Sequence, residues 1–190
     1  MKKRLLIGVI MTECQINFQL DILKGIISQG FKTNSDIVIL APLHNFYVVN
    51  PHKQAEKEIF KLIKSQAFDG FLYDRNTIYD EDIKLMTDNL LLASGKPVML
   101  LDSQEHKVFE STAIDDCTAF EQITDHLIDV HGYKKIYCLT GPKKFFVSEE
   151  RMRGFLISMK KHKLSTGKNA CFYGDFWKNA AEELAAKIIK

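Results

Sequence analysis

The chain has 190 residues, of which 46% are hydrophobic, a content that is ample for a packed core and argues against disorder. Its 26 basic and 24 acidic residues leave a formal charge of +2, so the chain lacks the dense basic face that binding to a phosphate backbone requires. We therefore expect a globular chain, either one large domain or one and a half ordinary ones, that makes no direct contact with nucleic acid.

The first apolar run, residues 5–10, follows a basic head and superficially resembles a signal peptide. It is too short for one, and Thr12 and Glu13 follow it instead of a cleavage site of small residues. The run therefore predicts a buried first strand. No later segment is apolar enough to cross a membrane. The cysteines have neither metal-binding nor redox spacing, which predicts reduced thiols and a cytoplasmic protein; they are Cys14, Cys117, Cys138 and Cys171.

Short apolar runs rich in β-branched residues alternate with longer stretches of helical period, which indicates an α/β fold, a parallel sheet with helices on both faces. The later runs are residues 36–41, 70–73, 97–101, 109–114, 135–139 and 170–173. Because the earlier runs are apolar throughout, we expect strands that are buried on both faces.

The stretches between the runs carry apolar residues at helical spacing, so each predicted helix has a buried side. Such residues are Phe18, Ile22, Ile26 and Ile27, then Ile59, Phe60, Leu62, Ile63 and Ala67. Residues 79–92, 120–130 and 152–162 continue the pattern, and the last fifteen residues, rich in Ala, Glu and Lys, predict a final helix.

The predicted strands divide unevenly along the chain. Five fall in residues 1–115, which we expect to form a nearly complete N-terminal lobe, and two fall in residues 116–190. If each strand–helix unit takes roughly 30 residues, completing the second sheet needs on the order of 80 more. The sequence therefore predicts two lobes, of which the second is truncated.

The order of several short motifs points to a known family. They are residues 7–10 (IGVI), 23–26 (LKGI), 68–72 (FDGFL), 95–102 (GKPVMLLD), 114–116 (IDD), 126–128 (HLI), 131–136 (HGYKKI), 139–142 (LTGP) and 151–155 (RMRGF). Together they resemble the sensor domain of LacI/GalR-type regulators, which is similar to periplasmic sugar-binding proteins of type I. The resemblance covers almost the whole chain. It implies a two-lobed fold in which a ligand between the lobes shifts an open–closed equilibrium.

The resemblance implies the ligand-sensing domain of a bacterial transcription regulator, itself not an enzyme, acting as a homodimer on a small-molecule effector such as a sugar. Two departures leave alternatives open. The order His131-Gly132 replaces the family's Gly-His and resembles sensor domains fused to GGDEF diguanylate cyclases or to AraC-type DNA-binding domains. Met1 lies only a few residues before the first strand, so we expect any output domain downstream of Lys190. A free-standing ligand-binding or scaffold protein is a third possibility.

Polar residues follow the predicted strands, where ligands bind in open parallel sheets. They are Thr12, Glu13 and Gln15 after the first strand, Asp74 and Arg75 after the third, Asp102 and Ser103 after the fourth, and Lys143 after the sixth. Carboxylates and an arginine fork suit the hydroxyls of a polyol, and an aromatic ring suits its C–H face. The predicted ligand-binding residues are Thr12, Gln15, Phe18, Asp74, Arg75, Asp102, Arg151 and Trp177.

Each of these residues has a plain structural alternative. The resemblance places Arg151 in the cleft, but it could instead pair along its own helix. Asp102, which matches a family position near the cleft, could be an ordinary turn former, and Asp74 and Arg75 could simply face solvent. Phe18 could stack on a ligand, but the competing interpretation is that it packs in the core with Ile22. Trp177 resembles an aromatic residue that stacks on sugars in the family, yet a core or interface position is open as well, and Asp115 is expected to tether the crossover.

No cofactor or metal is predicted. The histidines do not form a constellation of metal ligands, since His126 and His131 are five residues apart and His44 and His52 eight apart. Residues 11–15 contain no glycine for a dinucleotide pyrophosphate, and Cys14 has no base assigned to it by spacing. A phosphoacceptor receiver domain would need an acidic pair directly after the first strand, which is missing.

Overall fold

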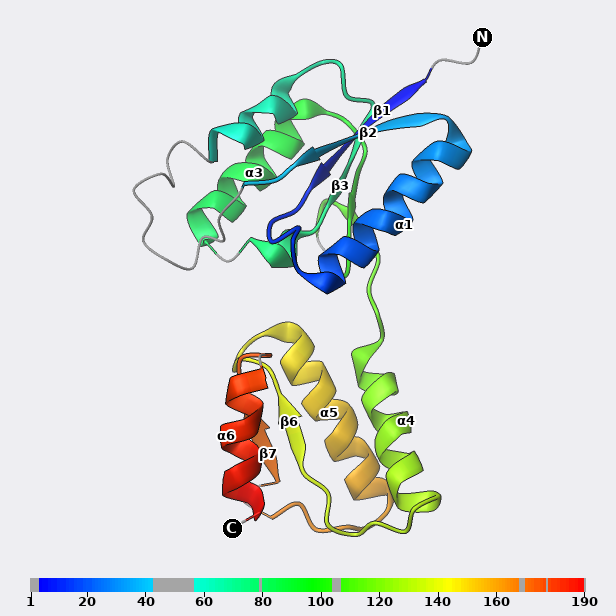
Figure 1. Ribbon diagram of the computed structural model, residues 1–190, viewed down its shortest axis with the longest axis vertical. Helices are drawn as coiled ribbons and strands as arrows, with labels where there is room; N and C mark the ends of the chain where they lie inside the picture. Colours follow the sequence, from blue (N-terminus) through cyan, green and yellow to red (C-terminus); the bar gives the residue numbers. More distant parts are fainter. Residues whose placement is uncertain are drawn as a thin grey trace. The chain divides into compact units, whose positions relative to one another are not determined.

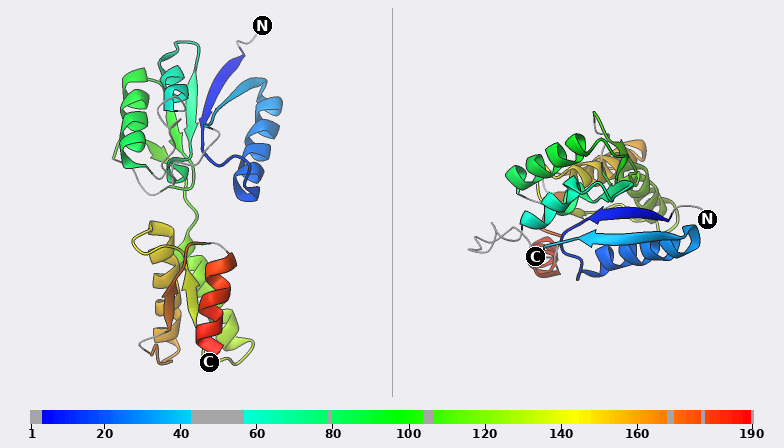
Figure 2. Two further views of the ribbon diagram at one scale, coloured as in Figure 1. Left: turned by 60° about the vertical axis from the view of Figure 1, so that its left-hand side comes forward. Right: turned by 90° about the horizontal axis from the view of Figure 1, so that it is seen from above.

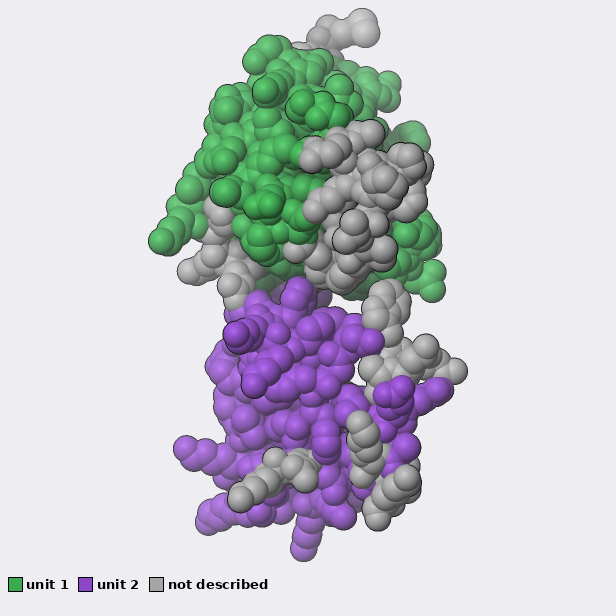
Figure 3. All heavy atoms as spheres, turned by 90° about the vertical axis from the view of Figure 1, so that its left-hand side faces the viewer, with its two compact units in different colours: residues 1–113 green, residues 114–190 purple. Residues whose placement is uncertain are grey.

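A computed structural model describes residues 4–42, 57–78, 80–103, 107–167, 170–176 and 178–189. The chain forms two compact units, residues 1–113 (unit 1) and residues 114–190 (unit 2), which Figure 3 distinguishes by colour. The units therefore divide between Ala113 and Ile114, whereas the strand pattern placed the division after Asp115.

Unit 1 is a parallel sheet of five strands in the order β2-β1-β3-β4-β5. Its elements are β1 (Leu5–Ile10), α1 (Asn17–Thr33), β2 (Ser35–Leu40), η1 (Lys57–Lys64), β3 (Gly70–Tyr73), η2 (Arg75–Thr77), α3 (Glu81–Ser94), β4 (Val98–Leu100) and β5 (Glu110–Ser111). All four strand pairings are parallel, so the carboxyl ends of the five strands lie along one edge of the sheet.

Helices cover both faces of this sheet, with α1 on one side and η1 and α3 on the other (Figures 1 and 2). Successive residues of a strand point to opposite faces, and β1 shows the consequence. Val9 packs with Leu23 of α1, whereas Ile10 belongs to the cluster that contains Phe60 of η1 and Leu91 of α3. β1, an interior strand of the sheet, thus packs against elements on both faces; residues 8–10 are buried as the apolar run predicts, whereas Leu5 is exposed.

Two expectations of burial in unit 1 are wrong, and one predicted helix has a different form. β2 is an edge strand, and Val38 and Ile39 are exposed instead of buried. Phe18 is 53% exposed, so its placement in the core is incorrect, and Ile27 is also exposed. The predicted helix over residues 59–67 is the 3-10 helix η1, which nonetheless buries Phe60 and Ile63.

Unit 2 is a smaller layer structure built on two parallel strands. Its elements are α4 (Asp116–Asp129), β6 (Cys138–Thr140), α5 (Phe146–Lys161), β7 (Cys171–Tyr173) and α6 (Lys178–Ile189). Phe155 and Met159 of α5 are buried against Cys138 of β6, with Phe120 of α4 packed on the same cluster. In Figures 1 and 2, α6 lies on the other side of the strands from α5.

Two local features set how α4 begins and packs. Asp115 precedes the helix and accepts hydrogen bonds from the backbone N–H and the hydroxyl of Thr118, at 2.9 and 2.7 Å, which makes it the N-cap. These bonds lower the pKa of Asp115. Gly154 of α5 then allows close approach of α4, because a Cβ at that position would overlap the carbonyl oxygen of Cys117.

The predicted α/β class, with five strands in the first part and two in the second, is confirmed. The ends of the elements differ more. β5 is reduced to Glu110–Ser111 from the expected 109–114, and β6 begins at Cys138 instead of at Lys135. The helices α4 and α5 begin at Asp116 and Phe146, earlier than expected, since their first turns lack apolar periodicity. None of the helices described is long and apolar enough to cross a membrane.

Candidate functional site

The carboxyl edge of the unit 1 sheet brings together three of the predicted residues, Thr12, Asp74 and Asp102. The Thr12 N–H donates to Thr77 Oγ1 at 3.0 Å, and the Thr12 hydroxyl donates to the Thr77 carbonyl, so the end of β1 is tied to η2. Asn76 donates from Nδ2 to the carbonyl oxygen of Asp102 at 2.5 Å, which joins η2 to the end of β4. η2 thus organises this edge, which no local pattern in the sequence indicated.

Asp74 is the most perturbed acid of this edge. It is 3% exposed, and burial is the largest cause that raises its pKa from 3.8 to about 7, followed by the charge of Asp102. Backbone N–H groups of Thr77 and Asn76 act in the opposite direction, and Glu13 adds a smaller upward effect. A buried carboxyl whose pKa lies near neutrality is a common property of functional sites.

Arg75 is not free to bind a ligand in the same way, because it forms an ion pair with Asp88 of α3. Its Nε contacts the two carboxylate oxygens at 3.2 and 3.1 Å, and its Nη2 lies 2.9 Å from Oδ2. The buried Tyr73 hydroxyl lies near the same carboxylate, and burial together with Asp88 raises its pKa. The interpretation that Asp74 and Arg75 simply face solvent is therefore wrong for both.

The remaining candidates that follow β1 are less ordered by contacts. Gln15 and Phe18 are exposed, so a ligand could reach either side chain. Cys14 is half-buried, its Sγ lies 3.7 Å from the carbonyl oxygen of Met11, and burial and Asp74 raise its pKa. A thiol whose pKa is raised is a poor nucleophile at neutral pH, in keeping with the inert role expected for Cys14.

In unit 2, Arg151 of α5 is held by residues from two other segments, namely α4 and the stretch that follows β7. Its Nε donates to Asp116 Oδ1 at 2.7 Å, which joins α5 to the first turn of α4. Its Cζ lies 5.5 Å from the ring centre of Phe120 and 5.7 Å from that of Phe176, so aromatic rings contact the guanidinium as cation–π partners. The alternative of pairing along its own helix is wrong, because Asp116 belongs to α4.

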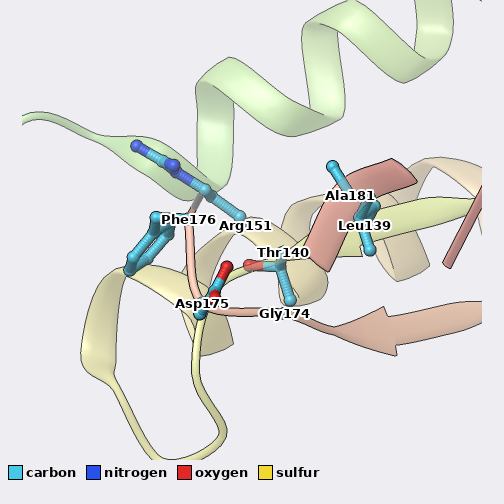
Figure 4. Close-up of a pocket in the computed structure, with 7 residues that line it drawn as sticks. All are labelled: Leu139, Thr140, Arg151, Gly174, Asp175, Phe176 and Ala181. Carbon is cyan, nitrogen blue, oxygen red and sulfur yellow. The ribbon is translucent and has the colours of Figure 1, made fainter. Parts of the chain in front are cut away.

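Arg151 also lines a pocket of about 270 Å³ at the carboxyl ends of β6 and β7. The other lining residues are Leu139, Thr140, Gly174, Asp175, Phe176 and Ala181, which Figure 4 shows as sticks. In that view the Asp175 carboxylate and the Thr140 hydroxyl lie next to each other, and the Phe176 ring lies beside Arg151. The pocket therefore combines a cation, a carboxylate, a hydroxyl and an aromatic ring.

Phe176 has an unusual backbone that suits this position. Its φ of 69° lies in the left-handed region, which costs a residue with a Cβ about 1 kcal/mol or more. Its ring packs edge-on against Phe145 at 5.6 Å and requires Gly141 opposite, because a Cβ there would overlap the ring. Strain retained beside a pocket is a sign of a functional site.

The sequence indicates Arg151 as a site residue, but it does not indicate Asp116 and Phe176, which hold the guanidinium in place. Asp116 lies 35 residues from Arg151 in the chain, and the neighbouring Asp115 drew attention only as a tether of the crossover. Phe176 precedes Trp177, the aromatic residue that was predicted; Trp177 lies outside the described residues. Lys143 is exposed, with its Nζ 5.9 Å from the ring centre of Tyr173.

The described residues contain no cluster of three or more His, Cys, Asp or Glu side chains that could hold a metal ion. At the carboxyl edge of the unit 1 sheet, Asp74 and Asp102 offer hydrogen-bond acceptors. In the unit 2 pocket, Arg151 offers guanidinium donors and Phe176 offers an aromatic face. These are the groups by which proteins bind hydroxylated small molecules.

A family model described as periplasmic binding proteins and sugar binding domain of LacI family matches residues 4–187. The HTH-type transcriptional repressor PurR of Photobacterium profundum is 22% identical over 184 residues, which are 96% of this chain and 52% of PurR. The chain thus spans about half the length of this curated relative.

Two solved structures show the same fold. The crystal structure of the transcription regulator CcpA of Lactococcus lactis has a TM-score of 0.74 and 22% identity, and covers 98% of this chain and 65% of its own. The crystal structure of the lac repressor dimer bound to operator and the anti-inducer ONPF has a TM-score of 0.73 and 16% identity, and covers 99% of this chain and 61% of its own.

Proposed function

Because the chain belongs to the family of periplasmic binding proteins and LacI-type sugar-binding domains, we propose that it is the effector-binding part of a bacterial transcription regulator. The relatives reported above are transcription regulators, which supports a sensing role instead of a catalytic one. The alternative of a sensor for a GGDEF diguanylate cyclase gains no support from the family match or from these relatives, and we abandon it.

The observation that carries the proposal is the fixed guanidinium of Arg151 at the rim of the unit 2 pocket. Asp116 takes only its Nε, so the terminal amino groups make no hydrogen bond within the described part of the chain and stay available as donors. A guanidinium already held between Phe120 and Phe176 loses little freedom when a ligand binds, which favours affinity. The proposed ligand is a hydroxylated small molecule such as a sugar, whose oxygens accept from Arg151.

Ligand binding is tested by recording the melting temperature of the chain against a panel of sugars and nucleosides. A compound at 100 times its Kd stabilises the native state by about 2.7 kcal/mol, which gives a measurable shift. Absence of a shift with every compound would contradict the proposal. The single tryptophan, next to Phe176 in the sequence, offers a fluorescence signal for the same titration.

A matched pair of variants locates the site. Arg151→Ala should weaken binding of a compound found in the panel by roughly tenfold to a hundredfold, since hydrogen bonds to a charged group contribute about 1.5–3 kcal/mol. Arg153→Ala is the control, because Arg153 is exposed and pairs with Glu150 of its own helix. Equal affinities for Arg151→Ala and the native chain would remove Arg151 from the site.

We further propose that the protein acts in the cytoplasm as a homodimer, with its DNA-binding part in a segment outside residues 1–190. The four cysteines are free, and the lac repressor structure named above is a dimer on its operator. Sedimentation of the chain tests the dimer, and sequencing of the gene beyond the codon for Lys190 tests the predicted downstream position of the output domain.

A further inference from the structure

The chain reverses its direction just after the C-terminal end of α4, and the function proposed above does not involve this reversal. Gly132 has a φ of 69°, in the left-handed region that glycine adopts without cost. Its N–H donates to the Ile128 carbonyl at 2.9 Å, and the Tyr133 N–H donates to the Leu127 carbonyl at 3.1 Å. The bond from Gly132 is the single bond of an αL motif, and the bond from Tyr133 reaches one residue further back, so the chain reverses immediately after the helix.

This reversal gives the departure from the family's Gly-His order a structural consequence. With glycine in second place, His131 stands just before the left-handed residue and is turned back toward His126 in the last turn of α4. The Nε2 atoms of the two rings lie 3.1 Å apart, and the ring centres lie 4.9 Å apart at an angle of 75°. Tyr133 stacks on the His131 ring at 5.6 Å and 17°, which restricts its orientation.

We propose that His126 and His131 chelate one divalent transition-metal ion, such as Zn²⁺, Ni²⁺ or Cu²⁺, through their Nε2 atoms. A metal–nitrogen distance of about 2.0–2.1 Å places two neighbouring ligand nitrogens roughly 2.9–3.4 Å apart, for angles between right-angled and tetrahedral. The separation of 3.1 Å lies inside that range. Both side chains are exposed, so an ion reaches them without any rearrangement of the core.

The described residues supply no third histidine, cysteine or carboxylate to this pair, so water molecules complete the coordination of the ion. His162, the other described histidine, is already engaged by Asp125 at 2.9 Å. Imidazole ligands favour Cu²⁺ over Ni²⁺ and Zn²⁺, and they do not select Mg²⁺. The pair lies at the end of α4 that leads into the loop before β6, whereas the Arg151 pocket lies at the carboxyl end of that strand (Figure 1).

The test is a calorimetric titration of the full chain, freed of metal by a chelator, with nickel chloride. The His126→Ala/His131→Ala double variant measures background binding by the other four histidines of the sequence. The native chain should bind one more Ni²⁺ ion than this variant, and either single substitution should weaken that ion by roughly tenfold or more, since even an outer-shell partner costs that much. Equal binding by the native chain and the double variant would overturn the proposal.

Two further measurements separate a chelate from loose association. Gly132→Ala keeps both histidines, and its Cβ meets no atom within 4 Å, so it acts only through the left-handed backbone. It should weaken Ni²⁺ binding while far-ultraviolet circular dichroism shows the fold intact; full affinity would refute the role of the reversal. Competition by magnesium chloride at equal concentration would indicate oxygen ligands and would also refute the proposal.

Discussion

Gly154, the glycine of the Arg-Met-Arg-Gly-Phe segment, offers the sharpest test of how unit 2 is packed. In an isolated helix, Gly→Ala favours folding by about 1 kcal/mol, because alanine restricts the unfolded backbone and propagates the helix better. At Gly154 the added Cβ would overlap the carbonyl oxygen of Cys117 and approach the Cys117 carbonyl carbon and the Glu121 nitrogen, both at 3.0 Å. All three are backbone atoms of α4, which cannot rotate aside.

The structure therefore predicts that steric overlap outweighs helix propensity. α4 and α5 must separate by roughly 1 Å, and such a gap forfeits a quarter to a half of each dispersion contact across the interface. Phe155 and Met159, 2% and 1% exposed, are the side chains that lose these contacts. Overpacking should cost about 3 kcal/mol of folding free energy, and the higher helix propensity of alanine should return about 1 kcal/mol. We therefore expect Gly154→Ala to lower the free energy of unfolding by about 2 kcal/mol.

Gly25 is the matched control, since it lies in the middle of α1 and its added Cβ would meet no atom within 4 Å. Gly25→Ala should stabilise unit 1 by about 0.5–1 kcal/mol. Urea unfolding followed by circular dichroism gives the free energy of unfolding, and hydrogen exchange assigns each change to its unit. If Gly154→Ala were as stable as the native chain or more so, the close contact of α4 with α5 would be refuted.

Two further predictions follow from buried titratable groups. The pKa of Asp74 is 3.8 when unfolded and about 7 when folded, so the native state holds a proton that the unfolded state has lost, and stability falls as pH rises through this window. Asp74→Asn should therefore be more stable than the native chain near pH 8, by up to about 4 kcal/mol, and lose this advantage toward pH 4; a gain independent of pH in urea titrations would contradict the assignment. Cys138 is 4% exposed, and burial raises the pKa of its thiol to about 12. Because a maleimide reacts with an accessible thiolate, it should label half-buried Cys171 first and Cys138 only after unfolding. Equal labelling rates by mass spectrometry would show that β6 is open to solvent.

Much of the architecture is readable in the sequence, because a buried strand or an amphipathic helix is specified by residues close together in the chain. The runs at 5–10 and 70–73 coincide with β1 and β3, and both strands lie inside the sheet, where only apolar residues are stable. The ordered motifs also identify the family, and the resemblance of residues 151–155 (RMRGF) to it singles out Arg151 before any contact is known.

Contacts between distant segments decided the rest. Nothing in the run at 36–41 marks β2 as an edge strand, since edge position depends on which strand pairs with β1. Phe18 has the spacing of a core residue and is exposed. The ion pair between Asp116 and Arg151 spans 35 residues. Local pattern determines which side of an element is apolar, whereas the partners of a charged side chain are determined only when helices and strands pack, because electrostatic and steric complementarity act across space.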